Sequence, residues 1–568
     1  MKVVLVAVNS KYIHSNLAVK YLKAYTSDMD YECTNMEFSI NDREERVVEE
    51  IIGEKPDMVG FSCYIWNIEF IKKVATLVKL INPSIEVFYG GPETSFNPEE
   101  FLTNNVGEYV LEGEGEETYR EFIEEKLKGN NNDEKENYAE IKGLFTKIQG
   151  KIQYGGKRPL MDMNKIVFPY DEADDLSNKI VYYEASRGCP FNCKYCLSST
   201  THGVRFLDIN RVLKELQFFI DKKVKLVKFV DRTFNCNKKF ANTIWQYLVN
   251  NGGESCFHFE VSADLFSKDS LEILKQAPKG MFQFEVGVQT TNNVILNNIN
   301  RNIKFATIKE KVLELNELDN IKQHLDLIAG LPGEDFDSFR KSFNEVYEIS
   351  PEELQLGFLK LLKGSQMREE SEKWGMVYSP YPPYEILRTK DISYDELQVL
   401  KKIEHMVDKY LNSGKFYKIL EFFKRSDRFE DSFEFYLELS KFYDAKGYFK
   451  RNISNIDYYS IFVEFNRFIN AGDEELLLDI IRYEYFCFNN TKWVPDFLRL
   501  DLEKEEERNL KEKVMEEYNL RNINKISIFK FKYDIKEFIE NAEIHKRDNY
   551  IVFFIDGRKE KLFIRESK

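Results

Sequence analysis

Residues Ser186–Cys196 read Ser-Arg-Gly-Cys-Pro-Phe-Asn-Cys-Lys-Tyr-Cys and place three cysteines in the spacing C-x3-C-x2-C. Thiolates are soft ligands that suit iron–sulfur clusters and zinc. A closed structural zinc site takes four ligands, and the candidate for a fourth is His202. Three thiolates on a four-iron cluster leave one iron open to another ligand. The pattern therefore favours a cluster held by Cys189, Cys193 and Cys196, with a zinc site or a disulfide loop as the alternative.

The cysteine stretch lies between an expected strand and an expected helix. Ile180–Tyr183 is a short apolar run typical of a strand, and a helical pattern begins at about Ile209. In an α/β barrel, the loops that follow the strands carry the chemistry. We therefore expect the cysteines to lie at the mouth of such a barrel.

The cysteine stretch resembles the cluster motif of the radical S-adenosylmethionine (SAM) family, including the aromatic Tyr195 before the last cysteine. In that family the open iron binds the amino and carboxylate groups of SAM, and one electron cleaves SAM to methionine and a 5′-deoxyadenosyl radical. The resemblance implies a 4Fe–4S cluster and SAM as cofactors. It also implies that Tyr195 contacts the adenine through its backbone.

Composition limits the class of protein. A chain of 568 residues predicts three or four domains. It contains no run of 18 uncharged apolar residues, so we expect no membrane span, and Met1–Val8 reads as a first strand rather than a signal peptide. Eight cysteines, three of them clustered, suit a reducing cytoplasm. The net charge of −15 argues against broad nucleic-acid binding.

The first 130 residues or so alternate apolar runs with helical patterns. The expected strands are Val3–Val8, Asp57–Ser62, Ile85–Tyr89 and Glu108–Leu111, and the expected helices begin near Leu17 and Asn67. This alternation predicts a doubly wound, Rossmann-like open sheet. Its ligand is expected outside the carboxyl ends of the strands, where glycine-rich turns let the backbone approach closely.

Three of these turns, within residues 60–67, 89–93 and 111–116, resemble the cobalamin-binding domain that precedes many radical SAM domains. The resemblance covers most of residues 1–130 and implies that cobalamin is a third cofactor. The residues it places around cobalamin are Ser62, Cys63, Gly90, Gly91, Glu93, Gly113, Glu114, Gly115 and Glu116. The alternative is a flavodoxin-like sheet that only positions a substrate.

A second alternation of strands and helices begins at Lys179. The expected strands are Val181–Ala185, Leu226–Val230, His258–Ser262, Phe282–Val288, Leu325–Ala329 and Leu354–Leu359. Six strands with intervening helices predict a partial (β/α)6 barrel. The radical SAM resemblance implies that polar residues at the strand ends hold SAM, namely Asp231, Glu260, Glu285, Gln289 and Gly330. For Glu260 and Glu285 the alternative is a structural ion pair, with Arg232 or Arg301 as partner.

Four regions are therefore predicted in this α/β chain. Residues 1–135 form the cobalamin-binding domain, 136–178 a connector with a hairpin over 143–154, 179–380 the barrel, and 381–568 a C-terminal domain. Residues 130–137 read as a polar loop. The C-terminal domain is expected to be helical and then to form a β hairpin through Asp556-Gly557. It resembles the domain of unknown function found in such proteins, which implies no activity.

The resemblance as a whole implies a cytoplasmic, cobalamin-dependent radical SAM enzyme. The reaction it favours is methylation of an unactivated carbon, or a phosphinate phosphorus, on a small molecule or peptide. An electron donor such as flavodoxin or ferredoxin is expected. One alternative is a radical cyclisation, ring contraction or rearrangement in which cobalamin passes only electrons. The other is a non-catalytic sensor that binds the cofactors.

Histidine placement gives one further expectation. The pattern Asp-x-His-x-x-Gly, which supplies a protein imidazole to cobalt, is absent from the chain. Of the six histidines only His14 falls in the N-terminal domain, in the loop after its first strand, and no acidic residue is adjacent to it. We therefore expect cobalamin to bind without a histidine on cobalt.

Overall fold

A computed structural model describes residues 1–129, 138–201, 203–489, 494–500, 502–517, 523, 526–541, 543–555 and 559–565. The chain forms two compact units, and each is described here by itself. The first comprises Met1–Ser342 with Leu356–Leu397, and the second Phe343–Gln355 with Gln398–Lys568. Three features considered from the sequence lie outside the described residues: the polar loop 130–137, His202 and the Asp556-Gly557 turn.

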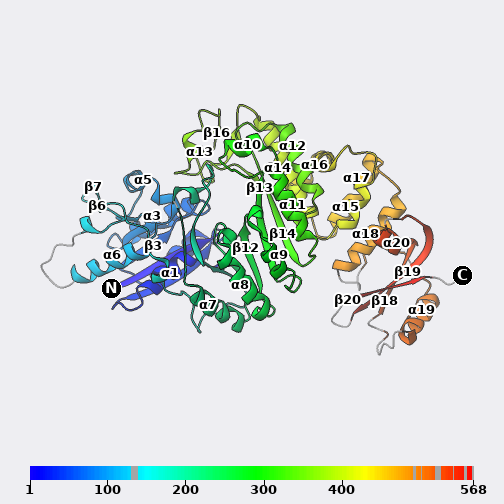
Figure 1. The fold of residues 1–568 in the computed structure, drawn as a ribbon, viewed down its shortest axis with the longest axis horizontal. Coiled ribbons are helices and arrows are strands. Elements are labelled where there is room, and N and C mark those ends of the chain that lie inside the picture. Colours follow the sequence, from blue (N-terminus) through cyan, green and yellow to red (C-terminus); the bar gives the residue numbers. More distant parts are fainter. Residues whose placement is uncertain are drawn as a thin grey trace. The chain divides into compact units, whose positions relative to one another are not determined.

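The first unit begins with a seven-stranded sheet in the order β2-β1-β3-β4-β5-β6-β7, blue to cyan in Figure 1. The strands are β1 (Lys2–Asn9), β2 (Glu32–Ser39), β3 (Met58–Ser62), β4 (Glu86–Gly90), β5 (Tyr109–Leu111), β6 (Leu144–Ile148) and β7 (Lys151–Tyr154). The first five are parallel. The strand order reverses beside β1, so the doubly wound sheet is confirmed.

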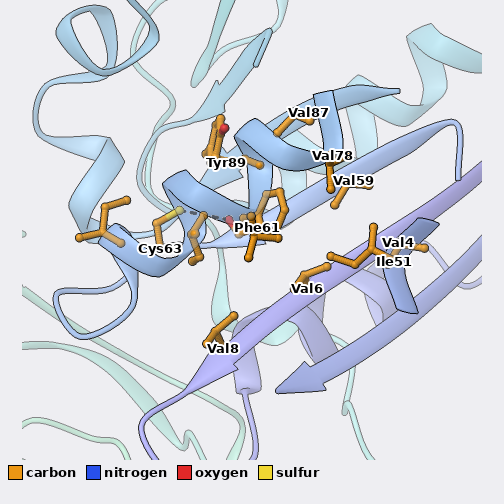
Figure 2. Packing of buried hydrophobic residues seen from close by; sticks show 14 of the residues in the cluster. Val4, Val6, Val8, Ile51, Val59, Phe61, Cys63, Val78, Val87 and Tyr89 are labelled. Atoms are coloured by element: carbon orange, nitrogen blue, oxygen red, sulfur yellow. Dashed lines mark hydrogen bonds between the residues drawn. The ribbon is translucent and has the colours of Figure 1, made fainter. Parts of the chain in front are cut away.

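Helices cover both faces of this sheet. They are α1 (Leu17–Tyr25), α2 (Glu44–Gly53), α3 (Ile68–Ile81), α4 (Pro92–Ser95), α5 (Pro98–Asn104) and α6 (Glu116–Gly129). In β1, Val4, Val6 and Val8 pack with residues of α2 and α3, as Figure 2 shows for Val4 and Ile51. The alternate residues of β1 pack with α1 and α6 on the other face. An apolar run without alternation is therefore buried from both sides.

Two elements of the first sheet differ from the sequence expectation. Strand β2 was not predicted, because it is an edge strand that reads Glu-Cys-Thr-Asn-Met-Glu-Phe-Ser and has few apolar residues. The hairpin over 143–154 is confirmed as β6 and β7. Its first strand pairs antiparallel with β5, so the hairpin extends the sheet.

The second sheet of the first unit has six strands in the order β15-β14-β13-β12-β11-β8. They are β8 (Ile180–Tyr183), β11 (Leu226–Phe229), β12 (Cys256–Val261), β13 (Phe282–Gln289), β14 (Ile321–Ala329) and β15 (Glu353–Phe358). The helices of this region are α7 (Ile209–Asp221), α8 (Lys238–Asn251), α9 (Lys268–Leu274), α10 (Asn293–Asn298), α11 (Phe305–Asn316), α12 (Phe336–Glu348) and α13 (Gln366–Glu369). All six predicted strands are present in chain order, and the sheet is open between β15 and β8 over the described residues. The partial barrel is confirmed.

A short antiparallel ribbon interrupts the barrel between β8 and α7. It consists of β9 (Ser186–Cys189) and β10 (Gly203–Phe206), with Arg187 opposite Arg205. The sequence did not predict it, because both strands are four residues long and contain a glycine. We call β9, β10 and the turn between them the cluster ribbon. A second small ribbon, β16 (Val377–Tyr378) and β17 (Ile386–Arg388), follows the barrel.

The second unit is helical and then forms a small sheet, as predicted. Its helices are α15 (Tyr417–Lys424), α16 (Ser432–Lys446), α17 (Asp457–Ile469), α18 (Glu474–Phe488), α19 (Lys504–Glu517) and α20 (Ile535–Asn541), preceded by α14 (Tyr394–Met406) and a π-helical turn, Val407–Leu411. Its strands β18 (Ile526–Tyr533), β19 (Lys546–Ile555) and β20 (Lys559–Arg565) are antiparallel. Within the described ranges, every helix is too short or too polar to cross a membrane.

Candidate functional site

The three clustered cysteines lie at the end of the cluster ribbon. Cys189 ends β9, and Cys193 and Cys196 follow in the turn toward β10. Backbone hydrogen bonds tie this turn to the barrel, because Lys194 N donates to Ile299 O at 3.0 Å and Lys194 O accepts from the Met367 amide at 2.9 Å. All eight cysteines of the chain are free thiols. The disulfide alternative therefore finds no support.

Polar groups surround the thiols. The Arg301 guanidinium Nη1 lies 3.9 Å from Cys193 Sγ, and the Thr233 hydroxyl lies 3.4 Å from Cys189 Sγ. Burial raises the pKa of the Cys193 thiol, and the nearby Arg301 charge opposes that rise. Across the described residues no three Cys, His, Asp or Glu side chains are already arranged around a common metal position. The assignment of the three cysteines as cluster ligands stays a prediction. Thiols beside the buried guanidinium of Arg301 are suitable donors for such a cluster.

Asp231 follows β11 and is buried, with 1% of its surface exposed. Its carboxylate accepts hydrogen bonds from the Ser186 hydroxyl and from the Ala185 amide, the latter at 3.0 Å. Burial raises its pKa to about 7. These contacts show that Asp231 fixes the start of the cluster ribbon, and its assignment to SAM stays a prediction.

The two glutamates predicted at the strand ends differ in position. Glu260 lies near the end of β12, and Arg232 Nη1 is 3.6 Å from its carboxylate, as the ion-pair alternative expected. Glu285 lies four residues before the end of β13, so its predicted place at the strand end is wrong. Its carboxylate is 3.5 Å from Lys228 Nζ and 3.4 Å from His258 Nε2. Glu285 therefore belongs to a polar group inside the barrel.

Three members of this polar group were not recognised from the sequence: Lys228, His258 and Asp326. Burial raises the pKa of Asp326, and Glu285 and Glu260 raise it further. The period-2 burial of β14, in which every second residue is partly exposed, is the signal that marks such inward positions. The barrel interior is thus polar.

Gln289 is the last residue of β13 and Gly330 is the first residue after β14, so both lie at strand ends as predicted. Gln289 is 7% exposed and adopts a positive φ of 72°. Gly330 has φ +85°, and a Cβ there would lie 2.8 Å from Ile386 Cγ2. Gln289 at the end of β13 and Gly330 directly after β14 thus lie at one edge of the barrel, because the carboxyl ends of parallel strands share an edge.

Glu334, in the turn after Gly330, forms a buried network with threonine and serine side chains. It is 1% exposed, and Thr290 Oγ1 donates to its Oε1 at 2.6 Å. Thr290 also contacts Ser342 Oγ at 3.1 Å. Burial raises the pKa of Glu334 to about 8. At a pH between the ordinary pKa of glutamate and about 8, Glu334 is therefore protonated in the folded protein and ionised in the unfolded chain.

We expect this proton to make stability depend on pH. Between about pH 4.5 and 8 the folded state binds more protons at Glu334 than the unfolded state, so its contribution to stability falls as pH rises. The Glu334→Gln side chain is uncharged at every pH, so this substitution should remove the pH dependence that Glu334 contributes. That contribution is at most about 1.4 kcal/mol of unfolding free energy per pH unit. Urea midpoints across this range measure it, with the exposed Glu310→Gln as control. Parallel pH curves for Glu334→Gln and the wild type would contradict the assignment.

At the carboxyl edge of the first sheet, the side chain of Cys63 does not face a ligand. It is 0% exposed, belongs to the core and points its thiol at the Phe61 carbonyl, 3.6 Å away (Figure 2). The prediction of Cys63 as a cofactor contact is therefore wrong for its side chain. Gly91 shows why the turn is tight, since its φ is +106° and a Cβ there would lie 2.5 Å from Cys63 O. Ser62 is the last residue of β3, and Gly90, which pairs with it, is the last residue of β4.

Glu93 is also engaged within the protein. It is 5% exposed, Tyr384 Oη donates to it at 2.6 Å, and Lys363 Nζ lies 3.6 Å away. Its carboxylate thus ties the turn after β4 to the segment that follows the barrel. The assignment of Glu93 to cobalamin stays a prediction.

The turn before α6 holds the cluster ribbon. Glu114 pairs with Arg205, and Glu116 pairs with Arg187 at 2.9 Å. Both carboxylates are paired with arginines, and the assignment of Glu114 and Glu116 to cobalamin stays a prediction. Gly113 precedes Glu114 and Gly115 lies between the two glutamates, and a Cβ at Gly113 would meet no atom within 4 Å. This turn therefore offers open backbone at Gly113.

His14 lies where the sequence placed it, in the loop after β1, but its imidazole has a partner in the barrel. Nδ1 is 2.7 Å from the Tyr182 hydroxyl of β8, and the Ile180 amide donates to Ile13 O at 2.9 Å. Burial lowers the pKa of His14. The Tyr182 hydroxyl orients the ring through Nδ1, and the expectation that no histidine ligates cobalt stays a prediction.

Three stretches match known protein families. Residues 3–123 match the B12 binding domain, residues 183–346 match the radical SAM superfamily, and residues 372–553 match a family described as a protein of unknown function, DUF4080. The predicted domain types and their order are confirmed. The chain has a B12-binding domain followed by a radical SAM domain, so the expected cofactor classes are those of its two domains.

Curated relatives carry methyltransferase names. The chain is 30% identical over 261 residues to an uncharacterised methyltransferase of Pyrococcus horikoshii, covering 44% of this chain and 55% of that one. It is 25% identical over 393 residues to the cobalamin-dependent radical SAM methyltransferase TokK of Streptomyces tokunonensis, covering 65% and 57%. The chain thus spans about half the length of the curated relatives it matches.

Solved structures share the fold. The radical SAM methyltransferase TsrM of Kitasatospora setae, with cobalamin and a 4Fe–4S cluster bound, superposes with a TM-score of 0.56 at 16% identity, over 68% of this chain and 82% of that one. The cobalamin-dependent SAM radical enzyme OxsB, with aqua-cobalamin and SAM bound, gives a TM-score of 0.57 at 14% identity, over 92% and 81%. At these identities the likeness supports the fold.

Proposed function

We propose that this chain, which carries a B12-binding domain followed by a radical SAM domain, is a cobalamin-dependent radical SAM methyltransferase acting on a small molecule or peptide. The observation that carries the proposal is the turn with Cys189, Cys193 and Cys196, anchored at the barrel mouth in the same compact unit as the B12-binding domain. The methyltransferase names of the relatives support the reaction type. The substrate's identity is left open.

The residues around the cluster ribbon have separable tasks in this proposal. The three thiols would hold the cluster, and the Arg301 guanidinium beside Cys193 would offset its negative charge. Asp231 keeps the ribbon in place through Ser186 and Ala185. When bound, the cluster, SAM and cobalamin would supply a 5′-deoxyadenosyl radical and a transferable methyl group.

The carboxyl edge of the first sheet is the proposed cobalamin site. Gly113 offers open backbone there, because a Cβ at this position would meet no atom within 4 Å, so a ligand can approach the main chain closely. Contacts there would come from backbone and from Ser62, because the carboxylates of the neighbouring turns are engaged. We infer that no histidine ligates cobalt.

The reaction also needs a source of single electrons. We infer a low-potential donor such as flavodoxin or ferredoxin, in a reducing cytoplasm that suits the free thiols. These two inferences rest on the proposed chemistry.

The test is turnover with methyl-labelled SAM. Protein reconstituted anaerobically with iron, sulfide and cobalamin is supplied with a reductant and an extract of small molecules and peptides. We expect both 5′-deoxyadenosine and S-adenosylhomocysteine, with the label in a product that has gained a methyl group. S-adenosylhomocysteine arises only where SAM donates a methyl group, so the two products together indicate methylation.

Two other outcomes would contradict the proposal. 5′-Deoxyadenosine without S-adenosylhomocysteine would favour a radical cyclisation or rearrangement. SAM binding without any 5′-deoxyadenosine under reduction would favour a non-catalytic sensor. A chain with its cluster removed by chelation serves as the control and should yield neither product.

A further inference from the structure

We propose that Glu114 and Glu116 are positioning residues that clamp the cluster ribbon to the B12-binding domain through Arg205 and Arg187. The inference rests on the proposed function, because it concerns where the three thiols are held relative to the cobalamin edge. Glu114 lies in the turn between β5 and α6, and Glu116 is the first residue of α6. Both arginines come from the ribbon that ends in Cys189.

The first half of the clamp is the pair of Arg187 and Glu116. Arg187 Nη2 lies 2.9 Å from Glu116 Oε1 and 2.7 Å from Glu184 Oε2, and its Nη1 lies 3.8 Å from Glu114. The side chains are sheltered, since Arg187 is 18% and Glu116 7% exposed. Buried pairs are little screened by salt, so loss of one partner leaves an uncompensated charge.

The second half is the pair of Arg205 and Glu114. Both guanidinium Nη atoms of Arg205 donate to the Glu114 carboxylate, one of them at 2.9 Å, which is the bidentate geometry that gives direction as well as strength. Met161 joins this pair, because its amide donates to Glu114 at 3.1 Å and its carbonyl accepts from Arg205 at 2.7 Å. Each half therefore fixes an angle as well as a distance.

The two halves act on one point of the ribbon. Arg187 and Arg205 are directly opposite each other in the antiparallel pair, and Cys189 lies two residues beyond Arg187. Glu114 and Glu116 likewise lie two residues apart, on either side of Gly115. The clamp thus grips both strands of the ribbon beside the first thiol.

The test uses the full chain with Glu114→Gln and Glu116→Gln combined. In cofactor-free protein we expect hydrogen–deuterium exchange of the ribbon to rise by about tenfold or more, because the ribbon loses its anchor. In reconstituted, cobalamin-loaded protein, we expect the power saturation of the cobalt(II) electron paramagnetic resonance signal to change, because it depends on the distance to the reduced cluster. A purely structural contact would leave this spectroscopic signature unmoved.

Matched variants decide between outcomes. Glu112→Gln, in the same turn but bonded to Tyr154, should leave ribbon exchange at the wild-type rate. The swap Glu114→Arg with Arg205→Glu restores opposite charges and should recover part of the protection, even if the double glutamine variant folds poorly. Unchanged ribbon exchange and unchanged saturation in the double variant would overturn the clamp. If wild-type protein binds neither cluster nor cobalamin, the proposed function fails, while the exchange result still decides the clamp.

Discussion

Cys193→Ala is expected to abolish the 4Fe–4S centre and, with it, all cleavage of SAM. Three thiolates are the whole protein ligand set of the proposed cluster, so none is spare when one is removed. Cys193 is the most buried of the three, at 6% exposed, and Arg301 lies beside it. Iron and sulfide per chain after anaerobic reconstitution, together with 5′-deoxyadenosine formed under reduction, measure the loss. Cys189→Ala and Cys196→Ala should behave alike.

The matched control is Cys236→Ala. This thiol follows β11 and is partly buried; burial raises its pKa, and Asp231 and Cys189 raise it further. It therefore shares the neighbourhood without belonging to the cysteine motif. Full iron loading and SAM cleavage are expected to survive its removal. Iron that persists in Cys193→Ala but disappears when Cys63 and Cys236 are replaced would show that the ligands were misassigned.

Strands β1 and β3, both predicted from the sequence, owe their pattern to burial on two faces. Val3–Val8 is uniformly apolar because helices cover both sides of β1, and no partner needs to be known to recognise it. Strand β2 is an edge strand with polar residues, so local pattern carries little information about it. The cluster ribbon is held by pairing between segments of four residues, a tertiary property that no period of hydrophobicity records.

The functional site likewise combines features that are local in the sequence with features that depend on tertiary contacts. The cysteine spacing is local, and the chemistry of three thiolates follows from it. The roles of Glu93, Glu114 and Glu116 depend on partners that lie 291, 91 and 71 residues away in the chain. These residues are assigned to cobalamin from the sequence because the turns that contain them resemble those of the cobalamin-binding domain. Long-range ion pairing, which short motifs do not encode, determines what these side chains do.

Gly188→Ala is expected to remove the cluster while leaving the first sheet folded. Gly188 has φ +106°, and a Cβ there would lie 2.1 Å from the Gly203 carbonyl oxygen across the ribbon. A backbone atom cannot rotate away, so the two strands must separate or the φ of residue 188 must change. The left-handed backbone alone costs an L-residue about 1–2 kcal/mol. Either response displaces Cys189, the next residue and the first thiol of the motif.

Gly203→Ala separates the effect of backbone strain from the effect of the steric clash. Gly203 also has a positive φ, +85°, but a Cβ there would meet no atom within 4 Å, so this variant carries the backbone strain without the clash. We expect it to keep most of its iron, whereas Gly188→Ala should bind little. Exchange protection of β1 and β3 in both variants shows whether the first sheet is intact. Full iron loading in Gly188→Ala would mean that the ribbon can open without moving Cys189, and the close packing of β9 on β10 would then not be what places the first thiol.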